Sequence, residues 1–163
     1  MFLFKKKELP KEEAPKPKVE YVSTYVVGID YYDSSKLLKD LEDELFENDD
    51  YSLSKKELLE EYMDGDKVYQ YEPYILRFKI VPEPTNPHDP NALKVIVMYD
   101  NQDYFIGYVP KTKCKALLKS LENNIIPSLT LVGGKYKQVY DDEIDKDEDD
   151  YSYLLEYGIK KGS

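Results

Sequence analysis

An alternation of apolar and polar side chains over residues 74–109 most constrains the fold of this chain. In residues 74–81, YILRFKIV, an apolar side chain recurs at every second position, at Leu76, Phe78 and Ile80. This period of two predicts a strand with one buried face. Residues 92–99 and 104–109 show the same period, and the polar turn at 100–103 between them predicts an antiparallel hairpin. The chain is therefore expected to build its core on antiparallel strands.

A rigid polar turn separates the first of these strands from the hairpin. Residues 83–91, EPTNPHDPN, hold three prolines, which fix φ, together with Asn and Asp, which hydrogen-bond their own backbone. We expect this turn to be rigid and to lead directly into a buried strand. Asp89 either caps the turn or offers its carboxylate to a ligand hydroxyl.

The remaining segments alternate between strands and helices. Ser54 and Glu57 form an S-x-x-E capping box, and Pro110 suits the first turn of a helix. The expected strands are 19–29, 126–140 (as one strand or two) and 151–161, and the expected helices are 34–47, one from Ser54 and one after Pro110. This order predicts an α+β protein, mainly β, with a small antiparallel β-barrel or a tightly curled sheet.

The negative charge of the chain is concentrated in two segments. The formal net charge is −10, yet residues 33–66 hold 13 acidic and 4 basic side chains, and residues 141–150 hold 8 acidic and 1 basic. These segments carry −9 and −7, so the other residues sum to +6. A mildly basic remainder is compatible with binding to phosphates, whatever the pI of the whole chain. We expect residues 141–150 to be a solvated acidic loop.

The residue inventory offers no catalytic or metal-binding set. One histidine and one cysteine cannot assemble a Cys/His zinc site, and neither phosphate-binding glycine motif occurs. Cys114 falls on the apolar face of the helix expected after Pro110, which favours a core thiol over a nucleophile. We therefore expect a protein that is not an enzyme and that binds no metal or other cofactor.

Three further features concern the environment and extent of the domain. No apolar run reaches the roughly 18 residues of a membrane span, and a lone cysteine excludes an internal disulfide. These features predict a cytoplasmic protein. The Lys-, Glu- and Pro-rich residues 1–18 predict a flexible tail, and residues 19–163 a single domain.

Three motifs of this chain together resemble the signature of the HIRAN domain family. They are VGIDYY at 27–32, EPTNPHDPNALKV at 83–95 and IGYVP at 106–110. The resemblance implies a compact OB-like or SH3-like β-barrel with a helix after the Gly-Tyr-Val-Pro hairpin. Residues 33–66 would then be an acidic two-helix insertion after the first strand. HIRAN domains occur in eukaryotic fork-remodelling ATPases such as the helicase-like transcription factor, and alone in bacteria and phages, the type that we expect here.

The resemblance also implies a ligand. In the remodelling ATPase the domain captures the 3′-hydroxyl end of single-stranded DNA. By position, Tyr31 and His88 would stack on bases, Asp89 would bind the terminal hydroxyl and Asn86 would be a nearby polar contact. We expect a single-stranded DNA-binding module of DNA repair or processing, acting on the 3′ end or within the strand, beside a helicase or nuclease.

Four other residues complete the candidate nucleic-acid-binding set. Of Tyr31 and Tyr32, one ring is expected to pack and the other to be exposed. Tyr108 faces either the core or the ligand. Lys111 and Lys113 either meet phosphates or belong to an ordinary solvated helix face.

The acidic residues support an alternative function. Asp30 stands where the DNA-capturing relative has an arginine, and a negative charge there repels phosphate. Together with the charge of residues 33–66, this substitution favours a protein-interaction or DNA-mimic module whose acidic insertion binds a basic partner.

Overall fold

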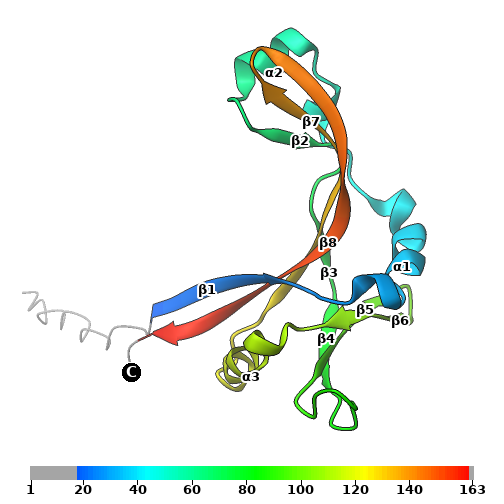
Figure 1. The fold of residues 1–163 in the computed structure, drawn as a ribbon, viewed down its shortest axis with the longest axis vertical. Coiled ribbons are helices and arrows are strands. Elements are labelled where there is room, and N and C mark those ends of the chain that lie inside the picture. The colour runs from blue at the N-terminus through cyan, green and yellow to red at the C-terminus, as the bar shows by residue number, and fades with distance from the viewer. Residues whose placement is uncertain (1–17, 162–163) are drawn as a thin grey trace, which may run out of the picture.

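The computed structural model describes residues 18–161, in which two antiparallel sheets carry helices at their edges (Figure 1). The predicted tail, residues 1–18, lies outside this range except for Lys18, which begins the first strand. None of the helices in the described part of the chain is long and apolar enough to cross a membrane.

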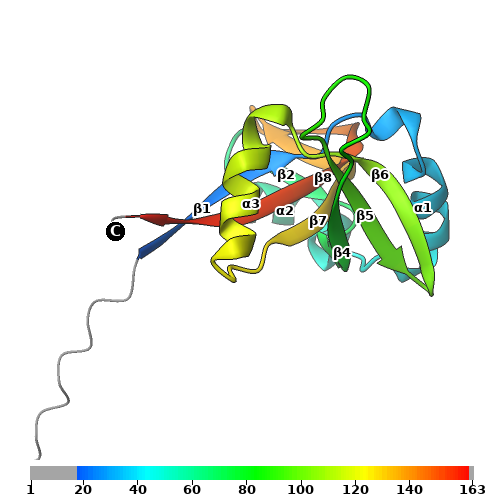
Figure 2. The ribbon, with the colours of Figure 1, turned by 90° about the horizontal axis from the view of Figure 1, so that it is seen from below.

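The larger sheet is built around one long hairpin. Its strands are β1 (Lys18–Tyr25), β2 (Lys67–Tyr69), β3 (Tyr74–Leu76), β7 (Ser128–Tyr140) and β8 (Glu143–Lys161). The order is β1-β8-β7-β2, and β3 also pairs with β7. Strands β1 and β8 extend away from the body as a two-stranded arm in both views (Figure 1, Figure 2).

The smaller sheet carries the segment from which the sequence analysis began. Strands β4 (Phe78–Pro82), β5 (Leu93–Tyr99) and β6 (Gln102–Tyr108) pair in the order β4-β5-β6. Strands β5 and β6 form an antiparallel hairpin within residues 92–109, where the alternation predicts one. The chain passes from the larger sheet to the smaller at Arg77, between β3 and β4.

The expected closed β-barrel is not found among residues 18–161. The two sheets remain separate sets of strands, and an isolated bridge between Val27 and Tyr108 joins the segment after β1 to β6. The class is nonetheless α+β and mainly β, as predicted.

The acidic run at residues 141–150 is a strand for most of its length and not the expected loop. Asp141 and Asp142 have φ of 48° and 59°, the left-handed pair that closes a two-residue hairpin. From Glu143 onward the run pairs with β7, with Lys135 opposite Glu148. Backbone pairing along β7 therefore overrides the polar composition of this segment.

Three α-helices and four short 3-10 helices complete the described chain. They are α1 (Ser34–Leu41), α2 (Lys55–Glu61), α3 (Cys114–Glu122), η1 (Ile29–Tyr31), η2 (Glu42–Glu44), η3 (Asp49–Ser52) and η4 (Lys111–Lys113). The helix expected over 34–47 thus ends at Leu41 and continues only as a 3-10 turn. The capping box of α2 is present, with Glu57 N donating to Ser54 Oγ at 3.2 Å.

The main core lies between the two sheets, α1 and α3. Its fully buried members come from every one of these elements: Leu37, Leu41, Val95, Val97, Ile106, Leu117, Leu129, Tyr153 and Leu155. Cys114 belongs to the same cluster, and burial raises the pKa of its thiol. A protonated thiol at the start of a packed helix fits the predicted core role and not that of a nucleophile.

A close backbone contact at Gly107 ties β6 to the segment after β1. Val27 and Tyr108 exchange two backbone hydrogen bonds of 2.9 Å. Gly107 has a φ of 152°, and a Cβ atom there would lie 2.3 Å from the Val27 carbonyl oxygen. Only glycine permits this approach, which explains the Gly-Tyr-Val sequence in this strand.

Replacing Gly107 should therefore be costly. We expect Gly107→Ala to lower the free energy of unfolding by about 3 kcal/mol, because the Val27 segment must move away. Gly65→Ala is the control: its φ is also positive, at 93°, but no atom lies within 4 Å of the new Cβ. The control should lose about 1 kcal/mol in urea denaturation, and equal losses would contradict the role of the close contact.

Candidate nucleic-acid interface

The segment after β1 presents two adjacent tyrosines in different environments. Gly28, with φ of 76°, precedes η1, at whose end Tyr31 and Tyr32 stand. Asp33 anchors the segment, because its N–H donates to the Phe105 carbonyl at 2.8 Å and its carboxylate accepts from the Phe105 N–H at 3.1 Å. Tyr31 is 83% exposed, whereas Tyr32 packs against β6. Tyr32 is itself 39% exposed, so one ring packs, as expected, but neither ring is buried, and Tyr31 is the more exposed of the two.

Three aromatic rings form a platform beneath Tyr31. Tyr32 stacks on Phe105 with a centroid distance of 4.1 Å and an interplanar angle of 23°. Tyr108 meets both rings edge-on, at 5.8 Å from Tyr32 and 5.3 Å from Phe105. Tyr31 contacts this platform through the edge of Tyr32, at 6.5 Å. The half-buried Tyr108 therefore supports the platform, and burial raises the pKa of its hydroxyl.

The carboxylate of Glu83 joins the platform to the proline-rich turn. It accepts hydrogen bonds from the Tyr108 hydroxyl at 3.0 Å and from Asn86 Nδ2 at 2.9 Å. It also pairs with Lys94 Nζ at 2.8 Å, where both side chains are partly buried. Lys94 in turn lies 5.0 Å from the centroid of the Phe105 ring. One largely desolvated carboxylate thus fixes the relative positions of the turn, the platform and a cation.

The turn itself is held by Asn86. Its Oδ1 accepts from the backbone N–H groups of His88, at 2.9 Å, and Asp89, at 3.0 Å. The Asp89 carboxylate caps the next residues by accepting from Asn91 N at 2.9 Å. The side chain of Asn86 is thus fully engaged in hydrogen bonds that hold the turn. Asp89 makes one side-chain hydrogen bond through Oδ1 and none through Oδ2 within residues 18–161.

The remaining predicted residues lie on the outer surface of the same region. The turn projects from the body in both views (Figure 1, Figure 2). The His88 side chain is exposed, as is Lys111 in η4, while Lys113 is half-buried. Asp30, in η1, is also exposed and places a negative charge beside Tyr31. The region thus combines exposed aromatic rings with charges of both signs.

The structure adds three residues that the sequence analysis missed: Glu83, Lys94 and Phe105. The alternation of β6 places Tyr104 and Ile106 in the core, so Phe105 must face outward, and an outward aromatic residue is a signal that sequence reasoning can use. The contacts of Glu83 and Lys94 depend on the pairing of β4 with β5, which sequence periodicity does not specify.

The composition of this region suits contacts with a nucleic acid. Within residues 18–161, no group of three His, Cys, Asp or Glu side chains is placed to hold a metal ion. An aromatic platform, a rigid polar turn and a few lysines are the elements of a stacking surface for bases. The region thus contains groups that can stack on bases and pair with phosphates.

A comparison with known protein families identifies the family of this chain. The model of the HIRAN domain family matches residues 19–138, most of the chain, so this protein belongs to the HIRAN domain family. HIRAN domains are a nucleic-acid-binding family. No curated protein and no solved structure is similar enough to the chain to count as a match.

The turn should depend on the side chain of Asn86 more than on that of Asn91. Asn86→Ala removes the acceptor for two N–H groups and a donor to Glu83, so we expect a loss of about 1–3 kcal/mol in the free energy of unfolding. Asn91→Ala, whose side chain makes no hydrogen bond within the described residues, should change it by less than about 0.5 kcal/mol. Urea denaturation of both variants measures the difference, and similar values would contradict this account of the turn.

Proposed function

We propose that this protein is a non-enzymatic module that binds single-stranded DNA through Tyr31 and the proline-rich turn, in DNA repair or processing. The observation that carries the proposal is the position of Tyr31: its ring is 83% exposed, yet its neighbour Tyr32 is stacked on Phe105. An exposed ring on a fixed backbone can stack on a base with little loss of side-chain entropy.

The turn supplies the polar part of the proposed site. Asp89 keeps one carboxylate oxygen without a partner among the described residues, and a carboxylate is a strong acceptor for a sugar hydroxyl. His88 offers a second exposed ring on the same turn. Lys111 and Lys113 follow β6 directly and supply positive charge for phosphates. In this arrangement Asp89 reads a 3′-hydroxyl, while the rings bind any base.

The function of such a module depends on what acts on the bound strand. A binding domain that makes no chemical change would act beside a DNA-processing enzyme, and we propose a helicase or nuclease as its partner. The alternative, in which the acidic residues 33–66 bind a basic protein, is favoured by the exposed Asp30 and by the exposed glutamates of α2. It predicts no measurable affinity for single-stranded DNA.

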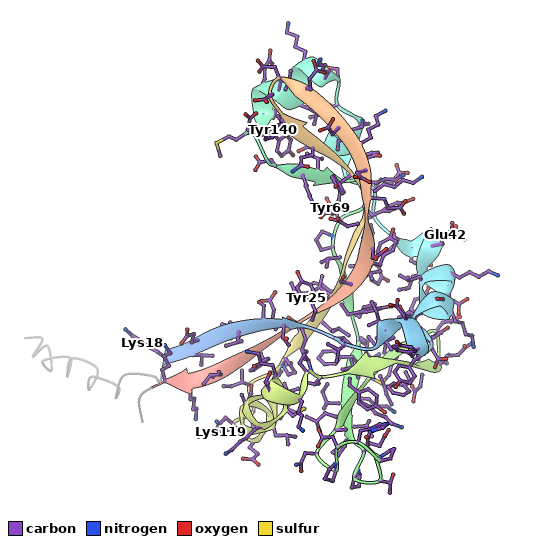
Figure 3. All side chains as sticks on the ribbon, in the orientation of Figure 1. Lys18, Tyr25, Glu42, Tyr69, Lys119 and Tyr140 are labelled. Carbon is purple, nitrogen blue, oxygen red and sulfur yellow. The ribbon has the colours of Figure 1, made fainter. Side chains whose placement is uncertain are left out.

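Stacking on Tyr31 predicts a large effect of one substitution. We expect Tyr31→Ala to weaken the binding of a short single-stranded oligonucleotide by about 5-fold to 150-fold in fluorescence anisotropy, which corresponds to the loss of one stacked base. Tyr140→Ala is the matched control, because Tyr140 is also exposed but lies at the far end of β7 (Figure 3). Equal affinities of the two variants would reject the stacking role of Tyr31.

Recognition of the strand end predicts a preference between two oligonucleotides. The protein should bind a 3′-hydroxyl end about tenfold or more tightly than a 3′-phosphate end, because the phosphate blocks the hydroxyl and repels Asp89. Asp89→Asn retains an oxygen for Asn91 N and should remove most of this preference. If the wild-type protein binds both ends equally, end recognition is wrong, although binding within the strand still stands.

A further inference from the structure

A second candidate surface lies on the bent hairpin of β7 and β8. The register of these strands shifts between Val132 and Gly134, and Gly133 and Gly134 have φ of 111° and 91°. A Cβ atom on Gly133 would lie 2.5 Å from the Asp150 carbonyl oxygen, and one on Gly134 would lie 2.8 Å from the Tyr151 hydroxyl. The hairpin that contains this glycine bulge is bent (Figure 1). The Tyr151 ring packs closely over Gly134.

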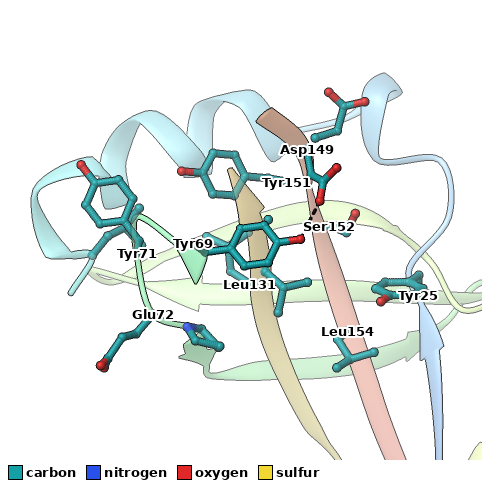
Figure 4. A pocket seen from close by; sticks show the side chains of 14 residues that line it. Tyr25, Tyr69, Tyr71, Glu72, Leu131, Asp149, Tyr151, Ser152 and Leu154 are labelled. Atoms are coloured by element: carbon teal, nitrogen blue, oxygen red, sulfur yellow. Dashed lines mark hydrogen bonds between the residues drawn. The ribbon is translucent and has the colours of Figure 1, made fainter. Parts of the chain in front are cut away.

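The inner side of this bend contains a cavity of about 520 Å³. Its lining includes Tyr25 from β1 and Tyr69 from β2 (Figure 3). Four tyrosines line it, with leucines as its floor (Figure 4): Tyr25, Tyr69, Tyr71, Tyr151, Leu131 and Leu154. None of these residues belongs to the platform or to the proline-rich turn, so the cavity is a separate site.

The charged residues of the cavity all have the same sign. They are Glu72, Asp149 and Asp150, and no lysine, arginine or histidine among residues 18–161 lines the cavity. Asp149 is neutralised in part by Lys67 at 3.1 Å, and it also accepts from the Tyr69 hydroxyl. Glu72 and Asp150 form no ion pair within residues 18–161 and have exposed side chains. Such a surface repels phosphate and attracts cations.

A cation already occupies this kind of environment at the edge of the cavity. The ammonium group of Lys67 lies 4.3 Å from the centroid of the Tyr136 ring while it pairs with Asp149. Hydrogen bonding to Asp149 raises the pKa of Lys67, so this group remains charged. Tyr71 and Tyr151 line the same cavity as the carboxylates of Glu72 and Asp150, so tyrosine rings and negative charges that are unpaired within residues 18–161 bound one cavity.

The surface around the cavity extends beyond the size of a single ion. Tyr25 pairs with Leu154, Leu154 with Thr130, and Thr130 with Ile75, so these four residues cross one face of the larger sheet. Ile75 is 78% exposed and Tyr25 is also exposed, which means that the face is uncovered. An apolar row beside a negatively charged cavity matches an extended polypeptide with long basic side chains.

We propose that the inner face of the bent hairpin binds a basic, Arg- or Lys-rich segment of a partner protein. The aliphatic stems lie on Tyr25 and Leu154, and the cationic groups reach the rings of Tyr71 and Tyr151 and the carboxylates of Glu72 and Asp150. The site shares no residue with the proposed DNA-binding site, so both ligands can bind at once. The inference does not depend on the binding of single-stranded DNA.

The test uses the full chain and a short fluorescent peptide of alternating arginine and glycine. In fluorescence anisotropy at low salt, the double variant Glu72→Gln/Asp150→Asn should bind the peptide about tenfold more weakly than the wild type. Tyr71→Ala should weaken it about fivefold, because the aromatic face is lost. Glu60→Gln/Glu61→Gln is the matched control: it removes the same charge from exposed residues of α2 and should change the affinity less than about twofold.

Four results would overturn the proposal. The first is no binding of the peptide by the wild type. The second is an equal loss of peptide affinity in the α2 control variant. This result would show that the peptide is attracted by the total charge of the protein or by residues 33–66. The third is unchanged affinity in Tyr71→Ala with a native circular dichroism spectrum, which would exclude the aromatic cavity. An acidic peptide of equal length should not bind at all, and comparable affinity for it would equally contradict the inference.

Discussion

The exchange of backbone hydrogen bonds between Val27 and Tyr108, made possible by Gly107, is the contact on which the site depends. It holds the end of the β1 segment against β6, and it thereby places Tyr32 on Phe105. Together with the two hydrogen bonds between Asp33 and Phe105, it fixes the segment that carries the exposed ring of Tyr31. Gly107 of the IGYVP motif therefore allows the segment that carries Tyr31 and Tyr32 to lie against the β5–β6 hairpin.

The two proposed surfaces differ in charge, because carboxylates are the charged groups of the cavity, whereas lysines and carboxylates are mixed near the proline-rich turn. Near the proline-rich turn, the carboxylate of Glu83 is largely neutralised by Lys94, and lysines follow in η4. On the inner face of the bent hairpin, carboxylates dominate and no basic side chain among residues 18–161 lines the cavity. An overall net charge of −10 conceals this difference. A protein that bridges a nucleic acid and a basic partner needs such a division, because each ligand is repelled by the surface of the other.

Local patterns predicted the local elements well. The β5–β6 hairpin and the capping box at Ser54 both follow from signals within a few residues. The acidic strand of β8 was missed, because its pairing with β7 is decided by a turn at Asp141–Asp142 and by backbone contacts that composition does not reveal. In the site, the exposure of one tyrosine was predictable, whereas the network at Glu83 required the register of β4 against β5. The open arrangement of two sheets likewise depends on long-range pairing.

The most direct test of the central claim is an NMR titration of the isotope-labelled protein with a short single-stranded oligonucleotide. The account predicts that the largest shifts in amide and aromatic signals occur at Tyr31, Tyr32 and the turn from Asn86 to Asp89. Signals of Tyr69 and Tyr151, on the inner face, should remain unchanged. Shifts centred on the inner face, or none at saturating oligonucleotide, would contradict the assignment of the nucleic-acid site.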